Sequence, residues 1–303
     1  MLTRRHFILS ATASCLSLPA WRTWATTTLK AGNITLDTVS DGNLVLPQGF
    51  IFSELPAADV ERLKKEFDLA GDTLAPPCNV TLLRDGTNTV LFDVGAGQDF
   101  QSTAGKLPEA LGTLGLSVED VTHVVFTHGH PDHLWGLLDE FDEPLFPNAS
   151  FLMGEQEFAY WTNPDTVNSI GAERSTFAVG AARRLAVIAD SIKLLGNDDK
   201  PVDGVTARLT PGHTPGHLAF EIDTPEGPVL VVGDAIGNHH MAFAYPGSLS
   251  GSDQDPALAA KTRLALMDQL ASANTRLIGF HLPEGGIGRV VRDGAAYRFA
   301  PQA

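Results

Sequence analysis

Residues 127–133 read THGHPDH, so three histidines and one aspartate stand within a single heptapeptide. The segment begins where an apolar run, HVVFT at 123–127, has the character of a buried strand. Pro131 then suits the first turn of a helix. The heptapeptide is therefore expected to form a strand-to-helix turn, the repeating connection of a layered α/β fold.

Within this turn, His128 and His130 fall in the loop, and Asp132 and His133 fall at the helix start. Side chains two residues apart at a strand end point to the same side, so a tight turn can bring all four together. Imidazole suits zinc, iron, copper and nickel, and an aspartate oxygen adds a charged ligand. A random chain of this composition would contain H-x-H-x-D-H with a probability on the order of one in a thousand, so the pattern indicates a metal site.

Three further candidate ligands follow predicted strands later in the chain. His213 lies in TPGHTPGH after a strand at 206–209, Asp234 ends VLVVGD, and His281 follows RLIGF. Ligand sites of layered α/β folds gather at the carboxyl ends of strands. We therefore expect these side chains to join the heptapeptide at one metal centre.

Short apolar segments bounded by Gly, Pro, Asp or Asn predict twelve strands, at 34–40, 80–84, 90–94, 123–127, 150–153, 192–195, 206–209, 218–223, 229–233, 276–280, 288–292 and 296–299. Helical patterns predict six helices, at 57–69, 106–115, 131–140, 155–161, 173–188 and 256–273. Strands alternating with helices predict sheets covered by helices. Because twelve strands are too many for one compact sheet, two sheets packed face to face are expected.

Composition narrows the function classes. The chain has 303 residues, 43% of them hydrophobic, and a formal net charge of −15. An acidic protein has no electrostatic basis for binding a phosphate backbone, so nucleic acid is not an expected partner. There is no Walker A loop, no dinucleotide fingerprint and no G-x-S-x-G elbow, since GSLSG has Leu249 at its centre.

The N-terminus resembles an export signal. Arg4 and Arg5 precede an apolar run at 7–18 that is shorter than the roughly 20 residues needed to span a bilayer. TRRHFI resembles a twin-arginine signal. We expect residues 1–27 to be removed, with cleavage between residues 20 and 31, leaving one domain at 28–303 in the periplasm without a membrane anchor. An uncleaved, disordered N-terminus and a lipoprotein modified at Cys15 are the alternatives.

The mature chain would keep a single cysteine, Cys78, so no internal disulfide can form even in an oxidising compartment. Cys78 is expected to be a small buried residue.

The order H-x-H-x-D-H, His, Asp, His resembles the metallo-β-lactamase-fold hydrolase superfamily, over the chain from about residue 34 to the end. The resemblance implies a four-layer αββα sandwich and two divalent metal ions, with zinc as the expected metal. It also implies a supporting aspartate, Asp93 in LFDVGAG. By the same resemblance His128, His130 and His213 hold one ion, Asp132, His133 and His281 hold the second, and Asp234 bridges both.

Particular positions narrow the branch of the superfamily. His133 stands where class B1 β-lactamases carry arginine, Asp234 where they carry cysteine, and His130 where flavodiiron proteins carry glutamate. TVSDGNLVLP, EFAYW, HTPGH, HLPEGGIG and YRFAP are most similar to secreted methyl-parathion-hydrolase-like enzymes, many of whose relatives are called lactonases. Acyl-homoserine-lactone lactonases often carry tyrosine where this chain has Gly237.

The expected reaction is attack by a metal-bound hydroxide on an uncharged ester, lactone or organophosphate triester. Asp132 and Asp234 are the candidates for orienting the hydroxide and moving its proton. Trp161, Phe52 and Phe243 are the candidate pocket residues. Two alternatives remain open: a mononuclear-iron sulfur dioxygenase that oxidises persulfides, and a non-catalytic binding protein. The expected partner is a small-molecule substrate. A homodimer, in which the partner is a second copy of the chain, is one assembly considered.

Overall fold

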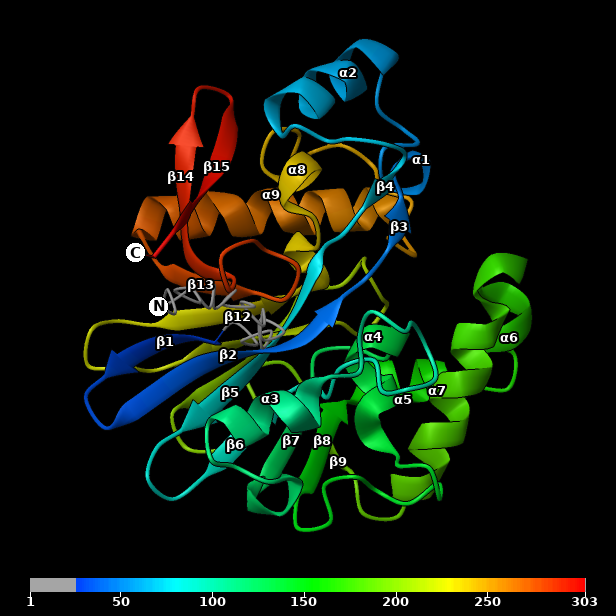
Figure 1. The fold of residues 1–303 in the computed structure, drawn as a ribbon, viewed down its shortest axis with the longest axis vertical. Helices are drawn as coiled ribbons and strands as arrows, with labels where there is room; N and C mark the ends of the chain where they lie inside the picture. Colours follow the sequence, from blue (N-terminus) through cyan, green and yellow to red (C-terminus); the bar gives the residue numbers. More distant parts are fainter. Residues whose placement is uncertain (1–25, 303) are drawn as a thin grey trace, which may run out of the picture.

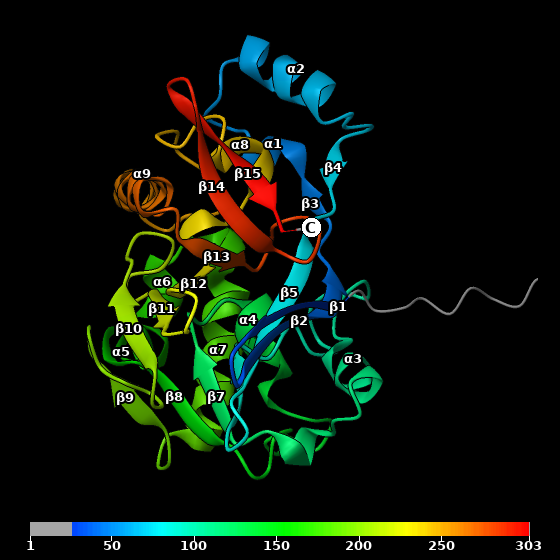
Figure 2. The same ribbon diagram turned by 90° about the vertical axis from the view of Figure 1, so that its left-hand side faces the viewer.

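The computed structural model describes residues 26–302. Two β-sheets pack face to face, and helices cover the outer face of each sheet (Figure 1). The turned view in Figure 2 shows the long helix α9 on one outside face, with the two sheets between it and the helices of the other face. The four-layer αββα sandwich that the sequence predicts is therefore confirmed.

The first sheet has seven strands in the spatial order β1-β2-β5-β6-β7-β8-β9. In that order they span Thr26–Ala31, Ile34–Asn43, Pro77–Arg84, Thr89–Phe92, His123–Phe126, Ser150–Gly154 and Lys193–Leu195. Strands β1, β2, β5 and β6 pair antiparallel with their neighbours in this order. Strands β6, β7, β8 and β9 pair in parallel. Parallel pairing requires crossover connections, which the helices between these strands provide.

The second sheet has six strands in sequence order, β10 to β15. They span Val205–Leu209, Leu218–Ile222, Val229–Gly233, Arg276–Gly279, Ile287–Asp293 and Ala296–Pro301. Only β12 and β13 pair in parallel, and the chain between them contains helix α9. A small third sheet pairs β3 (Leu46–Pro47) with β4 (Thr73–Leu74).

Alternating side chains along the strands build three layers of core. On β7, Val125 points into the layer between the two sheets, and its neighbours Val124 and Phe126 point toward the covering helices. On β12, Val231 faces the layer between the sheets and Val232 faces α9. Because successive side chains of a strand point to opposite faces, fully apolar strands of this kind can only lie in buried sheets.

The helices of the described chain span Gln48–Ile51 (α1), Ala57–Glu66 (α2), Leu107–Thr113 (α3), Pro131–Leu134 (α4), Glu155–Thr162 (α5), Thr166–Ser169 (α6), Ser175–Ile188 (α7), His239–Ala242 (α8) and Pro256–Ala273 (α9). The ends of α9 follow from its sequence. The Asp255 side chain accepts a hydrogen bond from the Leu258 N–H at 3.0 Å, Pro256 occupies the first turn, and Asn274 takes the left-handed conformation at the end.

Each of the twelve predicted strands has a counterpart, but the predicted helix at 131–140 is shorter. Helix α4 ends at Leu134, and a 3-10 turn, Trp135–Leu137, replaces the rest. The Gly136 N–H donates to the Gly95 carbonyl at 3.0 Å, and a Cβ at position 136 would lie 2.0 Å from the Val94 carbonyl oxygen. This close backbone approach diverts the chain from a helical path.

The predicted export signal at 1–27 falls outside the described residues except for its last two. Thr26 and Thr27 begin β1, which pairs with β2 along all six of its residues. The expected boundary at residue 27 therefore lies inside a strand. From residue 26 to residue 302, no helix combines the length and apolar character that a membrane crossing requires.

A buried aspartate near the end of β2 ties the first sheet to the segments that follow it. Asp41 is fully buried and accepts hydrogen bonds from the N–H groups of Ala96 at 2.8 Å, Gly105 at 3.1 Å and Leu107 at 2.8 Å. Burial raises the pKa of Asp41 to about 6, and these hydrogen bonds partly oppose that shift. The carboxylate thus fixes the start of α3 and the loop after β6.

We expect Asp41→Ala to lower the free energy of unfolding by about 3 kcal/mol, because it leaves two buried N–H groups and one partly buried N–H group without an acceptor. Urea denaturation measures this change. Asp203→Ala, at an exposed position, is the control and should change stability by less than about 0.5 kcal/mol. Equal effects of the two substitutions would contradict this role for Asp41.

Candidate metal centre

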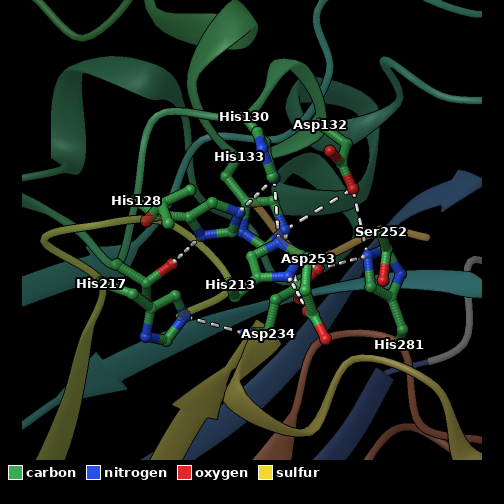
Figure 3. Close-up of polar contacts among 12 residues, drawn as sticks. His128, His130, Asp132, His133, His213, His217, Asp234, Ser252, Asp253 and His281 are labelled. Carbon is green, nitrogen blue, oxygen red and sulfur yellow. Dashed lines mark hydrogen bonds and ion pairs between the residues drawn. The ribbon is translucent and has the colours of Figure 1, made fainter. Parts of the chain in front are cut away.

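The predicted ligands come from four separate segments and meet at one edge of the sandwich. His128, His130, Asp132 and His133 follow β7, as predicted. The other three follow strands of the second sheet: His213 comes after β10, Asp234 after β12 and His281 after β13. Figure 3 shows all seven side chains turned toward one another.

Three imidazoles form the first group. His128 Nε2 lies 3.1 Å from His130 Nδ1, and His130 Nδ1 lies 2.9 Å from His213 Nε2. All three side chains are buried. Three histidine nitrogens converging on one point form the donor set of a divalent metal site.

The second group contains Asp132, His133 and His281. His281 Nε2 lies 3.1 Å from Asp132 Oδ2, and His133 Nε2 lies 3.5 Å from the same oxygen. Asp234 stands between the two groups, with Oδ2 3.3 Å from His213 Nε2 and Oδ1 3.4 Å from His133 Nε2. This placement suits a carboxylate that serves two ions.

Unpartnered buried atoms test whether the residues fit metal ions. Asp132 Oδ2, His133 Nε2 and Asp234 Oδ1 are buried and make no hydrogen bond of acceptable geometry within the described chain. A buried carboxylate oxygen without a donor is costly, so the folded chain leaves these atoms free for another partner. Their common direction and the His/Asp donor set fit divalent cations.

The titration behaviour of the histidines agrees with this fit. Burial, together with the neighbouring histidines, lowers the pKa of His128 and His130 well below the usual range, which keeps the neutral form that binds metals. Burial also acts to lower the pKa of His133, but the surrounding carboxylates, Asp132 and Asp234 foremost, raise it to about 10. Without a metal, the carboxylates therefore draw protons onto the ligands, and divalent ions would supply that positive charge instead.

Asp93 lies where the sequence places it, behind the ligand loop. Its Oδ1 accepts the Thr127 N–H at 2.7 Å, and its Oδ2 accepts the Thr127 hydroxyl at 2.8 Å. Oδ2 also lies 2.8 Å from His133 Nδ1. A hydrogen bond on Nδ1 fixes the ring and leaves His133 Nε2 facing the metal centre.

Two other ligands have supports that sequence reasoning missed. Asp253 Oδ1 lies 2.9 Å from His213 Nδ1, and its Oδ2 lies 3.3 Å from Arg263 Nη1. The Pro77 carbonyl accepts a hydrogen bond from His281 Nδ1 at 2.8 Å. No motif marks Asp253 or Pro77, because each contact joins residues distant in sequence.

Cys78 is buried, as predicted, and it lies beside the second group. Its sulfur and the ligand atoms of Asp132 and His281 all lie within 4.8 Å of one another. Burial raises the pKa of the Cys78 thiol to about 12, so the side chain is a neutral thiol.

A cavity of about 250 Å³ opens directly over the ligands. His130, Asp132, His213, Asp234 and His281 form its polar base. Its walls are mainly apolar and comprise Leu44, Leu46, Phe50, Ile51, Pro76, Phe100 and Phe177. Glu173 and Arg174 also line it, and Arg174 is its one Lys or Arg side chain.

The three aromatic residues predicted for the pocket lie outside this cavity. Trp161, Phe52 and Phe243 are all buried, and none lines this cavity. Phe52 packs in the core beside α1 and α2, and Phe243 packs against α9. In QGFIF, the turn of α1 directs Phe50 to the cavity and Phe52 to the core.

Trp161 has a supporting position instead. Its ring packs against Gly129, where an added Cβ would lie 2.4 Å from the indole nitrogen. The indole N–H donates to Glu157 at 2.5 Å. Glu157 is a further buried polar residue that sequence reasoning missed.

The chain is similar to several known proteins. N-acyl homoserine lactonase AttM of Azorhizobium caulinodans is 32% identical over 143 residues, which are 46% of this chain and 51% of AttM. The chain thus spans about half the length of this curated relative.

Two solved structures superpose over 92% of this chain and 97% of their own. AidC, described as a dizinc quorum-quenching lactonase in complex with the product N-hexanoyl-L-homoserine, has a TM-score of 0.86 and 23% identity. The hydrolase AbOPH of the β-lactamase superfamily has a TM-score of 0.84 and 26% identity.

The sequence model of the metallo-beta-lactamase superfamily matches residues 74–271, well over half of the chain. The match includes every ligand of the centre except His281. The chain belongs to the metallo-beta-lactamase superfamily.

Proposed function

We propose that this protein is a metal-dependent hydrolase that holds two divalent ions, with zinc as the metal, and cleaves uncharged esters, lactones foremost. The observation that carries this proposal is the convergence of seven ligand side chains, five of which form the base of an apolar cavity. Buried polar groups at the base of an apolar pocket are typical of a site that binds and transforms a small molecule.

When bound, the two ions lower the pKa of water and act as Lewis acids toward the scissile C=O or P=O group. Asp132 and Asp234 supply the carboxylates that line the cavity at its base. Their oxygens can orient an attacking water, accept its proton and pass it to the leaving oxygen. The apolar walls exclude bulk water and bind the non-reacting part of the substrate.

The cavity favours an uncharged substrate with an apolar substituent. Phe50, Phe100 and Phe177 offer aromatic surface. The Arg174 guanidinium donates to the carbonyl oxygens of Gly251 and Asp253, so it is a poor counter-ion for an anionic substrate. The names of AttM and AidC as lactonases, and the acyl-homoserine product described with AidC, support a lactone with an acyl chain.

The space beside Asp234 keeps organophosphate triesters within the proposed range. Gly237 lines the cavity, and a Cβ there would lie 3.4 Å from Asp234 Oδ2. With no side chain at this position, a bulky tetrahedral centre has room next to the carboxylate. A chain with tyrosine here would fill that space.

We expect zinc to raise the melting temperature of metal-free protein, because the ions bind only the folded state. At 100 times the dissociation constant the gain is about 2.7 kcal/mol, or several degrees. Differential scanning fluorimetry with and without EDTA measures this shift, and elemental analysis should give two zinc ions per chain. One iron per chain, with thiol-dependent oxygen uptake, would favour the sulfur dioxygenase instead.

Asp234→Asn should lower kcat/KM for an acyl lactone by about 100-fold or more, since it removes a carboxylate that can accept a proton at the cavity base. Initial rates with zinc-loaded protein, and circular dichroism to verify folding, measure this effect. Asp203→Asn is the exposed control. Full metal content and an unchanged rate in the Asp234 variant would refute the proposed reaction.

Phe177→Ala should raise KM for long-chain acyl lactones by about 10-fold and change it little for short-chain ones, because it removes apolar wall surface. Steady-state kinetics over a series of acyl lengths, with aryl esters and phosphotriesters in parallel, provide the comparison. Phe141→Ala, at an aromatic residue that is 76% exposed and outside the cavity, is the control. A uniform effect at every chain length would exclude this wall as the acyl-binding surface.

A further inference from the structure

Glu157, in the first turn of α5, is a carboxylate that the proposed reaction does not use. It is fully buried, and within the described chain its partners are two backbone N–H groups, an indole and a hydroxyl, with no Lys or Arg among them. Burial raises its pKa, and its hydrogen bonds act in the opposite direction. A buried acid without a cationic partner is costly, so its neighbours have to account for its presence.

Four donors surround the two oxygens of Glu157. Oε1 accepts the Gly129 N–H at 2.9 Å and the Trp161 indole N–H at 2.5 Å. Oε2 accepts the Thr214 hydroxyl at 2.8 Å and the Gly216 N–H at 2.9 Å. An ionised carboxylate has about four acceptor positions and no donor, so it matches this set and a neutral amide does not.

Three of the four donors belong to the two loops that carry the first group of ligands, and the fourth, Trp161, belongs to α5. Gly129 lies between His128 and His130, and Thr214 follows His213. Glu157 therefore joins two segments that are far apart in the sequence, at the points where their histidines converge.

Glycine is required at both backbone donors. A Cβ at Gly129 would lie 2.4 Å from the Trp161 indole nitrogen, and a Cβ at Gly216 would lie 2.2 Å from the Glu157 backbone nitrogen. Both loops thus pack directly on α5. The glycines of H-G-H and of HTPGH are explained by this close packing.

The second group has different supports. His133 is held by Asp93 and His281 by the Pro77 carbonyl. Glu157 makes no hydrogen bond with His133 or His281, nor with Asp93 or Pro77, the residues that hold them.

We propose that Glu157 is a positioning residue that holds the two loops of the three-histidine group together and so sets the metal affinity of that group selectively. The inference rests on the metal centre of the proposed function, but not on any substrate. Partners that orient metal ligands typically change metal affinity by 10–100-fold.

The test replaces the carboxylate with its isosteric amide. In Glu157→Gln, the amide NH₂ faces donors, which separates the loops without changing the size of the side chain. Metal-free full-length protein is titrated with zinc in a chelator buffer, and the imidazole ¹⁵N signals of each histidine are followed by NMR. We expect the signals of His128, His130 and His213 to change at a free zinc concentration 10–100-fold higher than in the wild-type protein. For His133 and His281 this concentration should change by less than twofold.

Glu155→Gln is the matched control, because it is the same substitution in the same helical turn at an exposed residue. In this control, every histidine signal should change at the same free zinc concentration as in the wild-type protein. If Glu157→Gln does not fold, Thr214→Val removes one donor from Oε2 at similar volume and should weaken the same three histidines by a few-fold.

Unchanged zinc dependence in Glu157→Gln, or an equal loss at both groups, would overturn the proposal. If the Glu157 variant does not fold, unchanged zinc dependence in Thr214→Val would also overturn the proposal. Failure of the proposed function looks different, since wild-type protein would then bind fewer than two ions or hydrolyse no substrate in the panel.

Discussion

Buried negative charge is the constraint on which this structure depends. Asp132 and Asp234 lie in a region from which water is largely excluded, and each keeps one oxygen without a hydrogen bond. Carboxylates in such a setting are retained only with compensating positive charge. In the metal-free chain, protons on His133 and His281 provide part of it. The apolar strands form two stable sheets, and polar ligands gather only where the strands end.

Each support of a ligand is close in space and distant in sequence. The contact of His133 with Asp93 spans 40 residues, as does that of His213 with Asp253, and the contact of His281 with Pro77 spans 204. The contact of His281 with Pro77 joins the two sheets, so this ring is oriented only where the sheets pack together. Because the ligands follow strands of both sheets, the metal centre is complete only in the packed sandwich, and buried polar side chains concentrate at this edge.

The sequence predicts those features that depend on residues close together in the chain. The strands follow from apolar runs, and the ligands follow from THGHPDH and from histidine or aspartate after later strands. Glu157 and Asp253 are absent from such patterns because their hydrogen bonds join segments far apart in the chain. The predicted pocket aromatics lie outside the cavity, because QGFIF does not reveal the rotation of a four-residue helix, which places Phe50 at the cavity and Phe52 in the core.

The metal ligands and part of the cavity wall lie in different parts of the chain. The superfamily match begins at residue 74 and includes all ligands except His281. Part of the apolar wall, Leu44, Leu46, Phe50 and Ile51, precedes that point. An uncharged substrate gains little from electrostatic steering, so its binding energy has to come from apolar contact. The segment around β3 and α1 therefore carries information about the substrate that membership of the superfamily does not contain.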